Sequence, residues 1–386
     1  MTPRVAGAPL KVAVVVPKYG VVGGAENFVF ELTERLAGDR RFEIHVFANR
    51  WRTGGAPIVF HHVPIVRFPR WAGPVSFAWF AQRAVRQVGC DLIHSHDRLF
   101  RMDVLTFHGV PHAEWIRATK RPWLSLFDRA MAGVERRGLM RMPPPLVLAV
   151  SGLVKSELLK VYPLPEERVQ VVHPGVDTTR FDAIPREAAR VAVRRRHGWP
   201  VDAVVALFIS MNYELKRLDL VLESMARLAR APNSDRLRLL VAGKGDAARF
   251  TTMARRLGIA DRVVFAGVRN DLPEYYRGAD MCLLPSRFDT FGLVVLEAMA
   301  AGIPVIITDR VGARDLVSDG VNGFVLPVDS PAGDLATAMG ALLDDSVRRR
   351  MGEVNRQVAG CLSWESAADK VAACYASLGA SDQRHH

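Results

Sequence analysis

Residues 285–304 of the chain read PSRFDTFGLVVLEAMAAGIP, which predicts a loop followed by a helix. Asp289 lies in the loop just before the expected helix, and Glu297 lies about two turns further along. Gly302 and Pro304 end the helix, because glycine favours the residue after a helix and proline cannot continue one. The segment therefore presents one carboxylate before a helix start and a second one inside the helix.

The first turn of this helix is predicted to be a phosphate site. Unpaired backbone N–H groups and the positive dipole end of a helix attract an anion. The residues expected in this turn are Thr290, Phe291, Gly292 and Leu293. With a carboxylate on either side, the turn predicts a site for a sugar nucleotide. The alternative is a loop carboxylate at the surface followed by a helix that simply packs on a sheet.

The segment resembles the signature of the retaining glycosyltransferases of family 4, which have the two-domain GT-B fold. That signature is a Glu, seven residues, a second Glu, and then Ala-Met-Ala-x-Gly-x-Pro. Residues 297–304, EAMAAGIP, match its second half, whereas position 289 is Asp where the family has Glu. This departure keeps the charge and shortens the side chain by one methylene. The resemblance implies that Asp289 contacts the donor sugar and that Glu297 contacts the ribose.

Bulk composition indicates a folded protein of two domains. The chain has 386 residues, of which 49% are hydrophobic, and single cores seldom exceed about 250–300 residues. No apolar run approaches the roughly 18 residues of a membrane-spanning helix. The apolar run at residues 12–16 leads into a motif and is interpreted as a buried strand, not a signal peptide. The four cysteines are widely scattered, which argues against disulfides or a zinc site and fits a reducing cytoplasm.

The net charge of +12 comes from 52 Lys and Arg against 40 Asp and Glu. Such a balance suits nucleic acid, an anionic membrane or a phosphorylated substrate. No recognition helix, RNA-binding signature or zinc finger accompanies it, so no nucleic-acid partner is expected. A generically basic proteome is the alternative explanation.

Short apolar segments alternate with amphipathic stretches of helix length, which is typical of parallel α/β sheets. The strands expected in the first half are residues 11–16, 43–47, 91–95, 104–107, 146–150 and 169–172. Those expected in the second half are residues 204–210, 237–242, 263–266, 281–285, 305–308 and 323–326. The fold class is therefore α/β with two Rossmann-like domains. Ligands in such folds bind at the carboxyl ends of the strands.

The expected domains are residues 1–175, which would bind the acceptor, and residues 176–362, which would bind the nucleotide sugar. A turn-rich break at residues 173–177 separates them. A basic helix is expected at residues 186–196, a final helix at about 364–378, and a frayed tail at 381–386. The family resemblance implies that the two domains face a central cleft and that residues 363–386 return to the first domain.

Gly23 and Gly24 follow the first strand and precede a helix expected at residues 25–36. Paired glycines let a backbone approach an anion closely, and the family has a Gly-Gly loop near the donor diphosphate and the acceptor. A tight turn into a packed helix is the alternative. Lys18 is a candidate for holding an anionic acceptor, although a solvated lysine is equally consistent.

Three histidines lie at or near the ends of two expected strands. His108 lies in Leu-Thr-Phe-His-Gly, and the family has a histidine at a similar place beside the donor sugar. His94 and His96 stand two apart with Asp97 beside them. A His-x-His pair can bind metal, but no third ligand has suitable spacing, so contact of His96 or Asp97 with the acceptor is preferred. The remaining alternative is polar residues at a strand end.

The second half supplies candidate cations for the leaving diphosphate. Lys216 matches a family lysine, while the arginine that commonly precedes it is absent, since Met211 and Asn212 occupy its place. Arg217 is the candidate replacement.

Two further loops resemble nucleotide-binding parts of the family. Gly243 belongs to a Gly-x-Gly turn after a strand, without a dinucleotide fingerprint. The backbone of Val268 is expected to read the base edge and Arg269 to stack on the base, unless this is only a surface loop. No Asp-x-Asp motif occurs, so no metal and no cofactor are expected.

The combined hypothesis is a retaining, metal-independent hexosyltransferase with a UDP-linked donor. The region around residues 18–24 and 101–135 most resembles the glucosyltransferases of lipopolysaccharide core. A front-face route, in which the leaving phosphate takes the acceptor proton, needs no protein base. The alternatives are a nucleotide-sugar epimerase on the same fold and a non-catalytic scaffold that binds nucleotide sugars.

The expected acceptor is a glycolipid or oligosaccharide, with the first domain on the cytoplasmic face of an anionic membrane. Two stretches mix cations with aromatic rings, as suits such an interface. Their residues are Arg67, Phe68, Arg70 and Trp71, and then Arg117, Lys120, Arg121, Trp123 and Phe127. Inward-folded aromatics with solvated arginines are the alternative.

Overall fold

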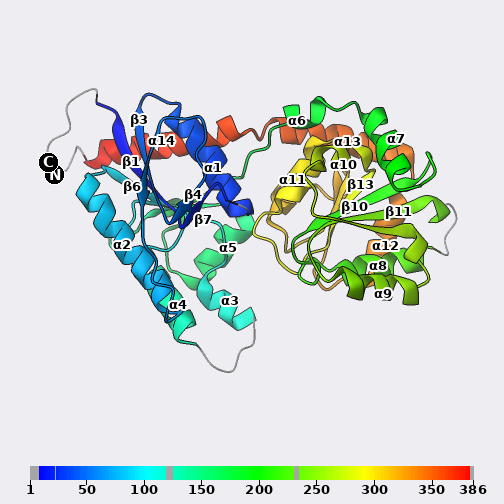
Figure 1. Cartoon of the computed structure of the whole chain (residues 1–386), viewed down its shortest axis with the longest axis horizontal. Coiled ribbons are helices and arrows are strands. Elements are labelled where there is room, and N and C mark those ends of the chain that lie inside the picture. Colours follow the sequence, from blue (N-terminus) through cyan, green and yellow to red (C-terminus); the bar gives the residue numbers. More distant parts are fainter. Residues whose placement is uncertain (1–7, 22, 119–124, 230–233, 383–386) are drawn as a thin grey trace. The chain divides into compact units, whose positions relative to one another are not determined.

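The computed structural model describes residues 8–21, 23–118, 125–229 and 234–382, and it divides into two compact units (Figure 1). Unit 1 consists of residues 1–175 and 364–386, and unit 2 consists of residues 176–363. Each unit has a parallel sheet with helices packed on it. The predicted α/β fold with two Rossmann-like domains is confirmed.

The sheet of unit 1 has the order β5-β3-β1-β6-β7-β8-β9, and all its pairings are parallel. Its strands are β1 (Leu10–Val15), β3 (Phe42–Ala48), β5 (Ile58–His62), β6 (Leu92–Ser95), β7 (Val104–Phe107), β8 (Leu146–Ala149) and β9 (Val169–Val171). The short strands β2 (Lys18–Tyr19) and β4 (Arg50–Trp51) pair separately. Chain order reverses between β1 and β6, which makes their carboxyl ends the expected ligand edge.

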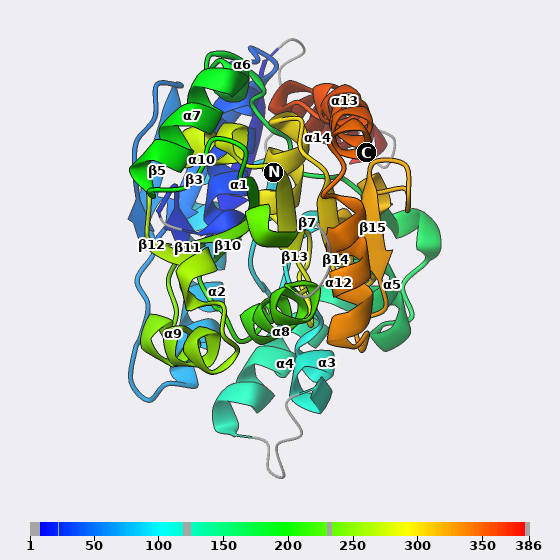
Figure 2. The same ribbon diagram turned by 90° about the vertical axis from the view of Figure 1, so that its right-hand side faces the viewer.

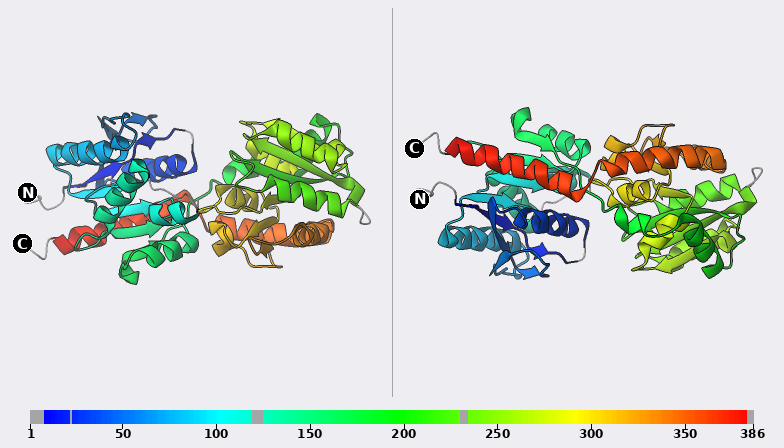
Figure 3. Two further views of the ribbon diagram at one scale, coloured as in Figure 1. Left: turned by 90° about the horizontal axis from the view of Figure 1, so that it is seen from below. Right: turned by 90° about the horizontal axis from the view of Figure 1, so that it is seen from above.

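The helices of unit 1 are α1 (Gly24–Ala37), α2 (Ala72–Val88), α3 (His112–Ala118), α4 (Leu126–Leu139), α5 (Gly152–Val161), the 3₁₀ turn η1 (Glu166–Arg168) and α14 (Trp364–Asp382). Phe28, Leu32 and Leu36 recur at helical spacing and form the buried face of α1. The last helix, α14, runs beside α1 (Figure 3). The C-terminal helix therefore returns to the first unit, as the family resemblance implied.

The sheet of unit 2 has the order β12-β11-β10-β13-β14-β15, also fully parallel (Figure 2). Its strands are β10 (Val204–Ser210), β11 (Leu237–Gly243), β12 (Val263–Gly267), β13 (Met281–Leu284), β14 (Val305–Thr308) and β15 (Gly323–Leu326). When the six strands are numbered by their order along the chain, they lie in the sheet as 3-2-1-4-5-6. This is the strand order of dinucleotide-binding Rossmann folds. The switch point lies between β10 and β13.

The helices of unit 2 are α6 (Thr179–Asp182), α7 (Arg186–Arg196), α8 (Leu218–Leu228), α9 (Ala247–Arg256), α10 (Leu272–Gly278), α11 (Leu293–Ala300), α12 (Ala332–Ala341) and α13 (Asp345–Gly360). The 3₁₀ turns of this unit are η2 (Ser234–Arg236), η3 (Ala260–Arg262) and η4 (Gly312–Leu316). All seven residues of β10 are buried, so this central strand is the axis of the core. Within the described residues, no helix is both long and apolar enough to span a membrane.

Three expectations about local structure were wrong or incomplete. The strand β5 was missed because its residues are half-buried or exposed and include two histidines. The helix expected to begin at Thr290 begins at Leu293. Ser381 was expected in a frayed tail, but α14 continues to Asp382, and residues 383–386 lie outside the described part.

Candidate functional site

The switch point of unit 2 brings together two residues that are 73 positions apart in the chain. Lys216 lies on the loop after β10, and Asp289 lies on the loop after β13. The Lys216 Nζ donates to Asp289 Oδ2 at 2.6 Å and to the carbonyl of Phe288 at 3.3 Å. Their side chains are only 16% and 20% exposed. A cation and a carboxylate are thus held together at the edge where Rossmann-like folds bind ligands.

The backbone of Asp289 is fixed from a neighbouring loop. It forms an isolated parallel bridge with Val311, in which its N–H donates to the carbonyl of Arg310 at 2.9 Å. The Asp289 Oδ1 also accepts from the N–H of Phe291 at 3.2 Å, as in an Asx turn. This turn uses the short side chain that distinguishes Asp from the family Glu. One carboxylate oxygen therefore shapes the loop and the other meets Lys216.

Gly292 sets the start of α11. Its φ of +89° is unsuited to a right-handed helix, so Thr290 and Phe291 stay in the loop and Leu293 is the first helical residue. A Cβ on Gly292 would lie 3.0 Å from a Val311 side-chain carbon. Within the described part of the chain, the amides of Gly292, Leu293 and Val294 have no hydrogen-bond acceptor. Three donors at a helix N-terminus are suited to an anion.

Glu297 lies on the second turn of α11 and is bound by one tyrosine. Its Oε2 accepts from the hydroxyl of Tyr276 at 2.6 Å. Burial raises the pKa of the Glu297 carboxyl above its ordinary value, while the Tyr276 hydrogen bond and the charge of Arg180 oppose this rise. The structure therefore holds a desolvated carboxylate that gains by acquiring another hydrogen-bond donor.

Gly243 ends β11 against the loop after β10. Its φ is +108°, and a Cβ there would lie 1.9 Å from the carbonyl oxygen of Ser210. The N–H of Lys244 donates to the same carbonyl at 2.9 Å. The close approach makes glycine necessary and holds the β10 and β11 loops side by side.

The remaining candidates of unit 2 lie on two loops: Arg217 on the loop after β10, and Val268 and Arg269 on the loop after β12. Arg217 has a left-handed backbone (φ +58°), and its guanidinium donates to the carbonyl of Val328 at 2.5 Å, with the buried Nε unpartnered among described residues. Arg269 pairs with Asp271 through two bonds of 2.7 and 2.8 Å. Val268 is 65% exposed. The guanidinium of Arg269 is thus oriented by Asp271 before any ligand arrives.

In unit 1, His108 follows β7 and is joined to His96, which follows β6. The His96 Nδ1 and His108 Nε2 are 3.0 Å apart, and their rings stack. Burial lowers the pKa of His108 to about 4, so its ring is neutral at pH 7. The His96 Nε2 is buried without a partner among the described residues.

Both ring nitrogens of His94 have hydrogen-bond partners within unit 1. Its two ring nitrogens meet the hydroxyls of Tyr375 at 2.5 Å and Thr106 at 2.7 Å, which ties α14 to β6. Neither nitrogen is left to bind a metal as part of a His-x-His pair. No group of three or more potential metal ligands occurs among the described residues.

Gly23 and Gly24 lie where α1 begins, after β1. Gly24 is the first helical residue, and the carboxylate of Glu26 would lie 2.0 Å from a Cβ on Gly23. Lys18 is exposed on β2. The loop therefore sits at the carboxyl edge of β1, beside the switch point of unit 1.

Sequence reasoning missed a buried carboxylate in unit 1. Glu135 is 1% exposed and accepts from Arg98 Nε at 2.6 Å, the His112 N–H at 2.9 Å and the Tyr162 hydroxyl at 2.7 Å. These partners are 23 to 37 residues away, so no local spacing could indicate them. The cluster braces the segments that follow β6 and β7.

Comparisons with known proteins identify the family of the chain. The family model described as Glycosyltransferase Family 4 matches residues 22–180, and the one described as Glycosyl transferases group 1 matches residues 203–345. The D-inositol 3-phosphate glycosyltransferase of Geodermatophilus obscurus is 32% identical, covering 95% of this chain and 88% of that protein. D-inositol 3-phosphate glycosyltransferase 2 of Catenulispora acidiphila is 31% identical, covering 93% and 91%.

Solved structures show the same fold. WaaG, a glycosyltransferase involved in lipopolysaccharide biosynthesis, has a TM-score of 0.80 at 23% identity, covering 94% of this chain and 98% of WaaG. HepE of Anabaena in complex with UDP-glucose has a TM-score of 0.72 at 19% identity, covering 95% and 100%. The chain is a GT-B protein that belongs to glycosyltransferase family 4.

Proposed function

We propose that this glycosyltransferase moves a hexose from a UDP-linked sugar to a glycolipid, with retention of configuration and without a metal. The observation that carries the proposal is the Lys216–Asp289 pair beside the open amides of α11. A cation and a helix N-terminus suit a diphosphate, and a carboxylate next to them suits sugar hydroxyls. The UDP-glucose complex of HepE supports the choice of donor.

The donor is assigned in parts to the residues of unit 2. Lys216 and the amides near Gly292 and Leu293 hold the diphosphate, assisted by Arg217. Asp289 binds sugar hydroxyls, and Glu297 binds the ribose through the oxygen that Tyr276 leaves open. The loops at Gly243 and at Val268 and Arg269 hold the nucleoside end. Gly23, Gly24 and His108 of unit 1 are assigned to the acceptor and the transferred sugar.

The proposed reaction follows a front-face route. The bond from the anomeric carbon to the donor phosphate oxygen breaks, the acceptor oxygen bonds to that carbon on the same face, and its proton passes to the departing phosphate. Lys216 and the α11 amides stabilise the negative charge that develops on the diphosphate. His108 is neutral at pH 7 and can therefore accept or donate a hydrogen bond without adding a charge beside the sugar.

A donor panel and the configuration of the product test this proposal. Among UDP-, GDP- and ADP-sugars, a UDP-sugar should raise the melting temperature most. This rise should be the same with and without EDTA. The anomeric proton of the product should show the donor's configuration by NMR. An inverted product would contradict retention, and loss of activity with EDTA would contradict metal independence. A free epimer formed without acceptor would indicate an epimerase, and donor binding without turnover would indicate a scaffold.

A small phosphorylated polyol is the second candidate acceptor. The curated relatives are D-inositol 3-phosphate glycosyltransferases, which favours this class. A radiolabelled UDP-sugar offered to a lipopolysaccharide-core lipid, to inositol 3-phosphate and to free inositol separates the possibilities. Incorporation into the lipid alone supports the first proposal, and incorporation into the phosphate ester alone supports the second.

Glu297→Gln should weaken donor binding about tenfold while it raises the melting temperature at pH 8. The ribose loses a charged acceptor, and a hydrogen bond to a charged group is worth about 1.5–3 kcal/mol. The folded-state pKa of Glu297 is raised, so its carboxylate costs stability as the pH rises through that value. The gain in melting temperature should therefore shrink as the pH falls toward 4. If Glu297→Gln and the wild type had equal melting temperatures at pH 8 and at pH 4, and equal donor affinity, the assignment of Glu297 to the donor site would be contradicted.

We propose a cytoplasmic location with unit 1 resting on an anionic membrane. Phe68 is 89% exposed and Trp71 is 42% exposed, so neither folds into the core. Arg70 lies over the ring of Phe127 at 4.9 Å. Lys120, Arg121 and Trp123 lie outside the described residues. Flotation with vesicles should increase with anionic lipid and decrease with salt.

A further inference from the structure

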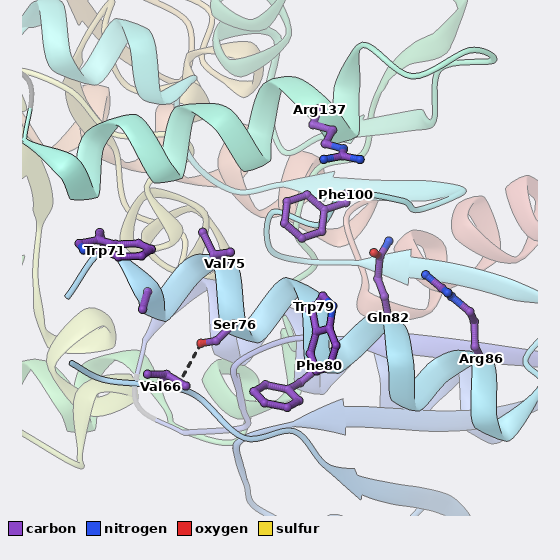
Figure 4. A pocket seen from close by; sticks show the side chains of 11 residues that line it. Val66, Trp71, Val75, Ser76, Trp79, Phe80, Gln82, Arg86, Phe100 and Arg137 are labelled. Carbon is purple, nitrogen blue, oxygen red and sulfur yellow. Dashed lines mark hydrogen bonds between the residues drawn. The ribbon is translucent and has the colours of Figure 1, made fainter. Parts of the chain in front are cut away.

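A groove on unit 1 lies between α2 and α4, away from the residues assigned to the reaction (Figure 4). Its cavity volume is about 540 Å³, within the range of small-molecule pockets. Figure 4 shows Val75 and Trp79 on the side of α2 that faces α4, and Phe80 on the side near Val66. The lining residues that carry the argument are Trp71, Val75, Trp79, Phe100, Arg86 and Arg137.

One end of the groove exposes apolar surface that the fold does not cover. Trp79 is 52% exposed, Trp71 is 42% exposed and Val66 is 42% exposed. Tryptophan is usually largely buried in a soluble protein, and neighbouring exposed apolar side chains mark an interaction surface. An apolar ligand would therefore gain by occupying this end.

The other end carries positive charge without compensation. Arg86 lies on the last turn of α2, and Arg137 lies on α4 with its guanidinium over the ring of Phe100 at 5.4 Å. No described carboxylate lies within ion-pairing distance of either guanidinium. The lining contains no acidic residue. The groove thus pairs an apolar stretch with a cationic end, which is complementary to an anionic amphiphile.

We propose that this groove holds one acyl chain of an anionic membrane phospholipid, with the phosphate at Arg86 and Arg137. From Ala72 to Arg86 helix α2 extends about 21 Å, since a helix rises 1.5 Å per residue. One leaflet of the hydrocarbon core is about 15 Å deep, half of the roughly 30 Å total, so a single chain fits along the groove. The inference rests on the proposed function only for the membrane location.

Bromine quenching of tryptophan tests acyl-chain contact directly. Vesicles of phosphatidylcholine with 30% phosphatidylglycerol, brominated on the acyl chains of the latter, should quench the full-length protein's fluorescence. Trp71→Phe with Trp79→Phe should remove at least half of the quenching. Trp51→Phe is the matched control, because Trp51 is also exposed (37%) and lies on β4, outside the groove lining. Quenching that persists in the double variant would overturn the proposal.

Charge and shape are tested by two further variants. Arg86→Gln with Arg137→Gln should weaken vesicle binding about 25-fold, since each cation near an anionic surface contributes about fivefold. The charge-matched control is Arg255→Gln with Arg256→Gln on α9. Val75→Phe fills the groove and keeps both arginines, so it should reduce bromine quenching more than it reduces flotation. Equal weakening by both arginine pairs would show that only net charge matters and would contradict a built site.

The outcome separates this inference from the proposed function. Binding of UDP and hydrolysis of the donor in lipid-free buffer should be unchanged in all the groove variants. If the groove instead seats a second copy of the chain, wild type will sediment as a dimer without lipid and the Trp71 and Trp79 double variant as a monomer. That result would overturn the lipid assignment while leaving the glycosyltransferase proposal intact.

Discussion

Asp289→Ala is expected to lower turnover about 100-fold, while UDP alone binds at least as tightly as before. The carboxylate is assigned to the sugar, so its loss misplaces the reacting carbon, and small misplacements cost on the order of 10² in rate. The same carboxylate holds Lys216 Nζ at 2.6 Å, so its removal frees a cation for the diphosphate. Steady-state kinetics and calorimetric titration of UDP measure the two effects separately.

The opposite directions of these effects make the prediction specific. Asp289→Asn keeps an acceptor for the Phe291 N–H and removes only the charge. Its turnover should therefore lie between that of the wild type and that of Asp289→Ala. Asp334→Ala, an exposed carboxylate in the first turn of α12, should change neither quantity. Parallel losses of UDP affinity and turnover in Asp289→Ala would show that the loop had collapsed, and would contradict a role confined to the sugar.

Most of the fold could be predicted because its strands are continuous apolar runs bounded by loops. Residues 104–107, 204–210, 305–308 and 323–326 were predicted with the bounds that the structure gives. Parallel strands buried on both faces produce such runs, whereas the edge strand β5 is half-buried and does not. The start of α11 was misplaced because the φ of Gly292 is +89°, and a glycine in the sequence does not by itself indicate which region of backbone conformation it adopts.

The candidate site could be predicted only as a set of separate loops. The strand-end rule placed Lys216 and Asp289 at one edge, but it could not pair their charged atoms across 73 residues of chain. The hydrogen bond of Tyr276 to Glu297 and the tie between His94 and Tyr375 were not foreseen either. Both join side chains whose proximity exists only after the sheets have formed. The acceptor is a harder case, because its chemistry is not encoded in the shared donor motif.

The largest loss of stability is expected from Asp280→Ala. Asp280 is fully buried just before β13, where it pairs with Arg194 at 2.6 Å and with Arg190 and accepts from the Val205 N–H at 2.8 Å. Removing one partner of a buried ion pair leaves the other charges uncompensated and costs about 3–5 kcal/mol. Urea unfolding should show the midpoint of unit 2 lowered by more than about 1 M, at m-values of about 1–3 kcal/mol/M.

A matched control separates burial from charge. Asp182 pairs with Arg356 at 2.6 Å, but both side chains are 46% exposed, so Asp182→Ala should cost no more than about 1 kcal/mol. Asp280 also fixes the start of β13 beside β10 through the Val205 N–H, and these two strands carry the loops of Asp289 and Lys216. Asp280→Ala should therefore weaken UDP binding although it touches no ligand. If Asp280→Ala lowered the stability of unit 2 while the affinity for UDP stayed unchanged, the result would contradict this argument. The Lys216–Asp289 pair would then form without the alignment of β10 and β13 that Asp280 provides.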